Sequence, residues 1–237
     1  MTGEIPPSAD PSRLPEIGLA VAGRGGGLDD LRSLAARCRG CDLWERATQT
    51  VFGEGSSDAR VMLVGEQPGD QEDLAGHPFV GPAGKVLDRA LAEAGIDRER
   101  AFVTNVVKHF KWRPSGKRRL HDRPNARQIR ACRPWLDAEL GVVRPAALVL
   151  LGATAAKSII GPDVRVSDAA EPIESDLAPL VLATIHPSAV LRSVDSEARE
   201  ATFRRLVGDL HLVGDWMRSA GRADLDPATP PTPGSPP

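Results

Sequence analysis

One stretch of this chain, Val61 to Gly84, constrains the fold more than any other. It opens with an apolar run, Val61 to Val64, whose valines are typical of a buried strand. The run ends in a loop in which glycines and a proline surround Glu66 and Gln67. Open α/β sheets bind their ligands in such loops, at the carboxyl ends of parallel strands. The stretch therefore predicts an α/β fold with a ligand site after its first strand.

A helix follows this loop and a second glycine-containing loop, Gly76 to Gly81. Pro82 suits the first turn of a helix, and Gly95 suits its end. Apolar residues recur between them at helical spacing, at Val86, Leu87, Ala90, Leu91 and Ala94. An open helix N-terminus beside a rigid loop suits a phosphate group. An ordinary strand-loop-helix connection without a ligand would have the same sequence pattern.

The rest of the chain alternates strands with helices. Three further apolar runs read as strands, at 101–108, 147–152 and 180–184. Helical spacing of apolar residues follows each of them, and the longest such pattern lies between Phe203 and Met217. The predicted fold class is α/β, a three-layer α-β-α arrangement around a central, mainly parallel four-stranded sheet.

Composition bounds the chain. Of 237 residues, 41% are hydrophobic and 26% charged, as in a soluble globular protein, and no apolar run approaches the ~18 residues of a membrane helix.

We expect a flexible Pro/Gly-rich leader at 1–27, one domain at 28–220 and a disordered Pro-rich tail at 221–237. Three cysteines and no signal pattern favour the cytoplasm. We expect a monomer.

Two of the three cysteines, Cys38 and Cys41, form a CxxC pair at the end of a short helical pattern. This spacing fits a reactive dithiol, half of a metal site, or two cysteines packed in a core. The spacing alone leaves these alternatives open.

Residues 108–133 hold ten Lys or Arg and only one acid, Asp122. A net charge of −2 for the whole chain makes this imbalance local. A solvated charged loop is one interpretation. A phosphate-facing surface is the one we favour, because nucleic-acid binding by a protein without overall positive charge requires such a patch.

Two motifs carry a resemblance to a known family. The first is Gly65-Glu-x-Pro-Gly-x-x-Glu-Asp followed by Gly76-x-Pro-Phe-Val-Gly-x-Ala-Gly, and the second is His186-Pro-Ser after the last strand. Together they resemble the active-site motifs of the uracil-DNA glycosylase superfamily, and most closely those of its iron-sulfur-containing bacterial and archaeal branch. The resemblance runs from about Ala35 to Trp216.

The resemblance implies a role for each matched residue. Phe79 would stack on a flipped uracil, Asn105 would pair with its edge, and His186 would donate a hydrogen bond to its oxygen as the base leaves. Glu66 and Gln67 would line the sugar side. Further pocket residues would be Gly65, Asp70 and Ser188. DNA phosphates would contact Gly84, Lys85, Lys117 and Arg118. The part played by His77 stays open.

The same resemblance implies a 4Fe-4S cluster, which that branch holds on four cysteines. The family's third cysteine follows a strand end like Val106-Val107-Lys108, where this chain has His109. We therefore expect a site of three cysteines and one histidine, made of Cys38, Cys41, His109 and Cys132. Histidine can replace cysteine on iron, and zinc is the less favoured occupant of the same ligands.

Lys117-Arg118-Arg119-Leu120-His121 resembles the signature of the UdgX-type branch, which cross-links itself to the DNA it has opened. It implies that His121 attacks C1′ of the deoxyribose with Glu66 as its partner, while Arg119 holds the loop closed over the sugar. The expected substrate is uracil-containing DNA, with single strands favoured. The alternatives are an ordinary glycosylase that uses water, and a non-catalytic metal-containing module that binds nucleic acid.

Overall fold

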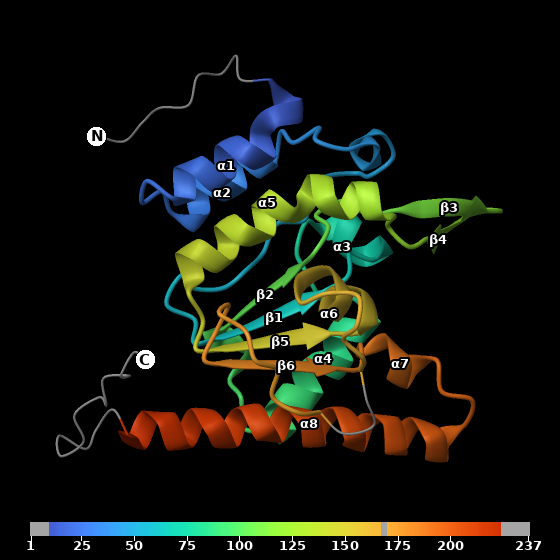
Figure 1. The fold of residues 1–237 in the computed structure, drawn as a ribbon. Coiled ribbons are helices and arrows are strands. Elements are labelled where there is room, and N and C mark those ends of the chain that lie inside the picture. Colours follow the sequence, from blue (N-terminus) through green and yellow to red (C-terminus); the bar gives the residue numbers. More distant parts are fainter. Residues whose placement is uncertain (1–9, 167–169, 224–237) are drawn as a thin grey trace.

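The computed structural model describes residues 10–166 and 170–223 and has a parallel sheet at its centre (Figure 1). The strands are β1 (Val61–Gly65), β2 (Ala101–Asn105), β5 (Ala147–Leu151) and β6 (Leu180–Thr184), in the order β2-β1-β5-β6. All three pairings are parallel, and every strand residue is buried, as expected for a sheet covered on both faces. The predicted fold class is confirmed.

Helices cover both faces of this sheet (Figure 1). One face packs against α1 (Leu14–Ala22), α2 (Leu28–Ala35), α5 (Ala126–Val143) and α6 (Ala153–Ile159). The other packs against α4 (Pro82–Glu93), the short α7 (Ser188–Leu191) and the long α8 (Ser196–Ala223). Short 3-10 turns occur at Pro11–Arg13, Asp42–Glu45 and Arg98–Arg100. None of the helices in the described ranges is both long and apolar enough to cross a membrane.

The register of the sheet brings the candidate site together. Gly65 at the end of β1 pairs with Asn105 at the end of β2, and Leu151 pairs with Thr184 at the end of β6. The loops that follow β1, β2 and β6 therefore leave the same edge of the sheet. This edge also carries α3 (Asp70–Ala75), a helix within the loop after β1.

The N-terminal segment differs from the predicted flexible leader. Residues 11–22 form a turn and then α1, which packs along α5. Leu14 is fully buried, and Gly18 lies so close to the Trp135 ring that a Cβ there would come within 2.2 Å of it. The prediction is wrong for this segment, because a nine-residue helix buries too few apolar residues to show a clear period. Residues 1–9 of the predicted leader, and 224–237 of the predicted tail, lie outside the described residues.

The middle of the basic stretch 108–133 is regular structure and not the charged loop that was one interpretation of its sequence. It forms an antiparallel hairpin of β3 (Trp112–Ser115) and β4 (Arg118–His121), whose turn contains Gly116 at φ +59°. Trp112 pairs with His121, so the two side chains lie on the same face of the hairpin. The hairpin projects from the body beside the amino end of α5 (Figure 1).

Candidate active site

Three residues converge where β1 and β2 end. A Cβ on Gly65 would lie 2.4 Å from Asn105 Oδ1 and 2.8 Å from Phe79 Cζ, so only glycine lets the amide and the ring approach each other here. Phe79 is buried and has φ +58°, a strained value for a bulky residue. Gly84 accommodates this conformation, because a Cβ there would lie 1.7 Å from the Phe79 carbonyl oxygen. The three predicted pocket residues Gly65, Phe79 and Asn105 are thus placed together.

His186 faces this group from the end of β6. Its ring lies 6.1 Å from the Phe79 ring, at an interplanar angle of 26°. Nδ1 accepts a hydrogen bond from the backbone N–H of Ser188 at 3.1 Å, so the proton of the neutral ring is on Nε2. Burial, reinforced by the charges of Arg192 and His121, lowers the pKa of His186 to about 4. At neutral pH this side chain is an uncharged N–H donor.

The Ser188 hydroxyl completes that arrangement. It lies 2.7 Å from His186 Nδ1 and accepts a hydrogen bond from Arg192 Nη1 at 2.7 Å. Ser188 therefore orients the histidine, where the resemblance implied only that it lines the pocket.

His121, at the end of β4, lies beside Glu66, one of the two residues that the resemblance assigned to the sugar side of the pocket. Its Nε2 is 3.4 Å from Glu66 Oε1, close enough for an ion pair but longer than a hydrogen bond. Burial lowers the pKa of His121 below its usual value, and the Glu66 charge opposes this effect. The His121 side chain is half exposed, and that of Glu66 is largely covered. A neutral imidazole with a carboxylate beside it is a competent nucleophile.

The hairpin that carries His121 is fixed at its base by Gln67. This buried amide donates to the backbone carbonyls of Lys111 and Asp122, each at 3.1 Å, and accepts from the N–H of Lys111 at 3.2 Å. Gln67 thus bridges both strands of the hairpin just outside β3 and β4. The resemblance implied that Gln67 lines the sugar side of the pocket, and the structure also gives it a part in positioning the hairpin.

Arg119 clamps the middle of β4 onto α3. Its Nε lies 2.6 Å from Asp70 Oδ1, and its Nη1 lies 2.6 Å from Asp73 Oδ2 and 3.2 Å from Thr48 Oγ1. Asp73 is fully buried, and its other contacts are donors of Thr48. Asp70 is therefore engaged by Arg119 and ties the hairpin to the loop after β1. Trp112 adds a further anchor by donating its indole N–H to the Arg46 carbonyl at 2.9 Å.

Sequence reasoning assigned no role to Glu72, which joins the two glycine-containing loops. Its carboxylate accepts from the N–H of Gly69 at 3.1 Å and from the N–H of Gly81 at 2.8 Å. The signal was available: a Glu three residues after Gly69 is where a helix-capping carboxylate is expected. Glu72 holds the Phe79 loop against the Glu66 loop.

A fully buried ion pair lies beneath Asn105. Lys108 Nζ is 2.7 Å from Glu139 Oε2, 2.6 Å from Thr104 Oγ1 and 2.7 Å from the Asn105 carbonyl oxygen. Glu139 also accepts from the N–H of Gly53 at 3.0 Å. Sequence reasoning missed this network, because pairing between distant segments leaves no local signal. It fixes the end of β2 and hence the position of Asn105.

The predicted cluster ligands lie in one region behind this network. Burial raises the pKa of the Cys132 thiol to about 12, and the charge of Lys108 opposes this rise. Cys38 and Cys41 are close enough to add to it. The Cys38 sulfur accepts from Trp135 Nε1 at 3.3 Å, and that of Cys132 from the N–H of Lys108 at 3.2 Å. N–H donors to sulfur are typical around iron-sulfur clusters.

His109 also belongs to this region, since it lines a cavity of about 460 Å³ together with Cys38. The Thr50 hydroxyl donates to the Ala35 carbonyl at 2.8 Å, so its contact with His109 Nε2 at 2.9 Å is an acceptor contact. That places the proton of His109 on Nε2 and leaves the lone pair of Nδ1 for a metal.

Within residues 10–166 and 170–223, no three Cys, His, Asp or Glu side chains are grouped as ligands of a single metal ion. A four-iron cluster takes one ligand on each iron, so its ligands stand farther apart than those of one zinc ion. The four predicted ligands thus share one region without the close grouping that a single ion requires.

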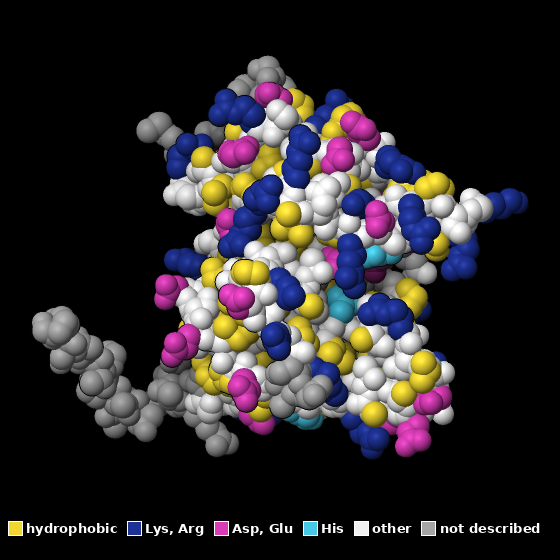
Figure 2. Space-filling model, turned by 45° about the vertical axis from the view of Figure 1, so that its right-hand side comes forward, with side chains coloured by type: hydrophobic (Ala, Val, Ile, Leu, Met, Phe, Trp, Pro, Cys, Tyr) yellow, Lys and Arg dark blue, Asp and Glu magenta, His cyan; other side chains and the backbone are white. Residues whose placement is uncertain are grey.

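The predicted phosphate contacts lie in two places. Gly84 and the exposed Lys85 are in the first turn of α4, next to Phe79, while Lys117 and Arg118 are exposed at the tip of the hairpin. Figure 2 shows histidine side chains in a hollow in the middle of one face, with lysine and arginine side chains on both sides of it. His77 is exposed and only pairs with Glu54, at 3.1 Å.

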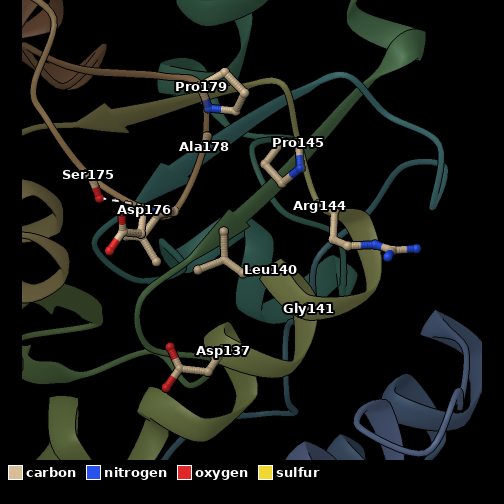
Figure 3. Close-up of a pocket in the computed structure, with 10 residues that line it drawn as sticks. Asp137, Leu140, Gly141, Arg144, Pro145, Ser175, Asp176, Ala178 and Pro179 are labelled. Carbon is tan, nitrogen blue, oxygen red and sulfur yellow. Dashed lines mark hydrogen bonds between the residues drawn. The ribbon is translucent and has the colours of Figure 1, made fainter. Parts of the chain in front are cut away.

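A larger cavity, of about 700 Å³, lies elsewhere. Its walls are the carboxyl end of α5 and the segment before β6, so it is at the amino-terminal edge of the sheet (Figure 3). The charged side chains that it contains do not converge, since Arg144 points away from Asp137 and Asp176 in this view. The polar groups that could do chemistry are at the opposite edge.

The fold and the site together define an α/β protein whose candidate pocket, with Phe79, Asn105 and His186 around it, lies at the carboxyl edge of a parallel sheet. Comparison with known proteins makes the class definite. The family model of the uracil DNA glycosylase superfamily matches residues 52–211, and the chain belongs to this superfamily.

Two similar proteins are type-4 uracil-DNA glycosylases. That of Thermotoga maritima is 38% identical over 187 residues, covering 78% of this chain and 92% of its own length. That of Archaeoglobus fulgidus is 36% identical over 192 residues, covering 77% and 92%. A type-5 uracil-DNA glycosylase of Thermus thermophilus is more distant, at 30% identity over 116 residues, covering 44% and 49%.

Proposed function

We propose that this protein excises uracil from DNA, favours single strands, and becomes covalently linked through His121 to C1′ of the resulting abasic site. The observation that carries this proposal is the placement of His121. A hairpin fixed by Gln67 and Arg119 delivers its imidazole to Glu66, close enough to His186 that its charge helps lower the pKa of that residue.

Recognition precedes chemistry. The Asn105 amide offers both a donor and an acceptor to the edge of uracil, and the Phe79 ring offers a stacking surface. A base must leave its stack to reach such a pocket, and a single strand spares the cost of breaking a base pair. This is why we propose single-stranded DNA as the favoured substrate.

Bond cleavage follows from the neutral state of His186. As the bond between C1′ and the base nitrogen breaks, its electron pair moves into uracil, which leaves as an anion. The Nε2–H of His186 donates to the uracil oxygen on which this charge develops. Because the donor is already oriented by Ser188, no reorganisation is required when the charge appears.

Capture of the sugar completes the reaction. One imidazole nitrogen of His121 donates its lone pair to the electron-poor C1′, and the proton on the other nitrogen passes to Glu66. The product is a neutral N-alkyl imidazole, which is a poorer leaving group than the uracil anion. The reaction therefore stops after one turnover.

The cluster is part of the proposal. We propose a 4Fe-4S cluster held by Cys38, Cys41, His109 and Cys132, whose contribution is to tie the N-terminal helices to the start of the hairpin. Stoichiometric iron with a visible absorption band supports it. Zinc in stoichiometric amount without iron would contradict it and support the alternative occupant.

Phosphate contacts would hold the strand on both sides of the pocket. We propose that Gly84 and Lys85 bind a phosphate at the start of α4, and that Lys117 and Arg118 contact the backbone from the hairpin tip. No second copy of the chain is needed to complete the pocket, and we propose a monomer.

A second candidate is an ordinary glycosylase that turns over with water. The half-exposed side chain of His121 favours it, because water can reach the sugar side. The two are separated by counting uracil released from a molar excess of single-stranded uracil DNA. The proposal predicts a burst of one uracil per protein and then no release. Continued release supports the water mechanism. No release at all supports a non-catalytic module that binds nucleic acid.

A further inference from the structure

We infer that exposed arginines along the amino-terminal part of α5 form a second track for DNA phosphates, which guides the strand flanking the excised base. The track consists of Arg123, Arg127 and Arg130. It rests on the proposed function, since it names how the substrate of that same site is held outside the pocket.

The position of the track links it to the site. Arg123 follows β4 by two residues, and its charge helps lower the pKa of His121, so the track begins beside the candidate nucleophile. Arg127 and Arg130, one helical turn apart in α5, lie next to each other on its surface. The amino end of α5 lies beside the hairpin (Figure 1), so the track begins close to the strand that carries His121.

The charges of these arginines are not neutralised within the described parts of the chain. All three side chains are exposed, and none makes an ion pair with a described residue. The nearby acids are engaged elsewhere, since Asp122 pairs with Lys111 at 3.5 Å and Asp42 accepts from Gln128 at 3.0 Å. The next arginine along α5, Arg133, is by contrast paired with Asp137 at 2.6 Å.

This arrangement disfavours the folded helix. Cations in the first turns oppose the helix dipole, and like charges one turn apart repel each other. The first turn of α5 contains no acid that would offset them. Folding gains nothing from these arginines, whereas a phosphate backbone running past the start of α5 would be bound by them.

The test compares two double variants with equal loss of charge. Arg127→Gln/Arg130→Gln removes part of the track, and Arg100→Gln/Arg144→Gln removes two cations at the amino-terminal edge of the sheet. Glutamine has nearly the helix propensity of arginine, so α5 should be kept. Arg123 stays unchanged because it lies beside His121.

DNA binding is measured as a function of salt concentration on a single-stranded uracil oligonucleotide of about 30 nucleotides. Uracil excision is measured on a short oligonucleotide of about five nucleotides. Each phosphate contact on a single strand contributes roughly 0.7 to the salt slope, so the α5 variant should lose about 1.4 from it. Its affinity at physiological salt should fall on the order of tenfold, with excision from the short oligonucleotide unchanged.

The outcomes separate the two proposals. The proposed track is contradicted if the α5 variant keeps the salt slope of the unchanged protein. It is also contradicted if the control variant loses as much of that slope as the α5 variant does. If the unchanged protein releases no uracil from either oligonucleotide, the proposed function fails first. A stability of the α5 variant at or above that of the unchanged protein excludes unfolding as the cause of weaker binding.

Discussion

Glu66 Oε1 lies 3.4 Å from Nε2 of His121, at the point where the loop after β1 meets the end of β4. Because this distance exceeds a hydrogen bond, the ring is not locked before substrate arrives, and either nitrogen can face the sugar after a turn about χ2. The pair places the Glu66 carboxylate, which can accept a proton, beside the neutral imidazole of His121.

Glu66→Gln should therefore slow cross-linking by about 100-fold, the usual contribution of a positioned base, while leaving the fold intact. The amide keeps the shape of the side chain but cannot take up a proton. The measurement is the single-turnover rate of adduct formation on denaturing gels. An unchanged rate of adduct formation would show that Glu66 takes no part in the reaction.

His186→Ala should reduce single-turnover excision by about 10²–10³-fold, the cost of losing one donor to a developing anion. Ser188→Ala is the matched control. It loses the hydroxyl but keeps the backbone N–H that fixes the tautomer of His186, so its loss should be much smaller. Equal losses in both variants would show that the orientation of the histidine, and not its donor, governs the rate.

His186 also makes stability depend on pH. Its pKa is about 4 in the folded protein and 6.5 as the ordinary value, so the unfolded chain binds more protons between these limits. Stability is therefore present above pH 6.5 and lost as pH falls toward 4, at up to about 1.4 kcal/mol per pH unit. Denaturant unfolding of the unchanged protein and of His186→Ala across this range should show a shallower dependence in the variant. Parallel curves would contradict the assignment.

Gln67→Ala should release the base of the hairpin, because two backbone carbonyls and one N–H lose their partner. Hydrogen exchange of residues 111–122 should become faster, and adduct yield should fall. Gln49→Ala is the control. It removes an amide that also donates to two backbone carbonyls, those of Asp73 and Leu74, but not to the hairpin. Faster exchange of the hairpin in both variants alike would argue against a specific role for Gln67.

The parts of the molecule that the sequence predicted are those with local signals. Four apolar runs predicted the four-stranded sheet. The glycine-containing loop after β1 and the His-Pro-Ser motif after β6 predicted where Glu66 and His186 lie. Helix α1 was missed because a short amphipathic turn on a Pro/Gly-rich background resembles a linker. The hairpin was missed because β3 and β4 are exposed and carry arginines in place of an alternating apolar pattern.

Residues that act through distant partners could not be predicted in the same way. The Lys108–Glu139 pair joins the segment after β2 to α5, and Arg119 on β4 pairs with Asp73 on α3, 46 residues away in the chain. Glu72 is an intermediate case, since its capping position after Gly69 is visible in the sequence but its contact with Gly81 is not. The sequence thus shows the motif residues, and the structure shows the contacts that hold them in place.

The most direct test of the proposed cross-link mixes the protein with a single-stranded uracil oligonucleotide and locates the sugar by peptide mass spectrometry after denaturation. We expect a detergent-stable adduct with the deoxyribose on His121. We also expect that His121→Gly forms no adduct yet still releases uracil with turnover, since water then reaches C1′. An adduct that persists in His121→Gly, or a sugar attached to another residue, would contradict it.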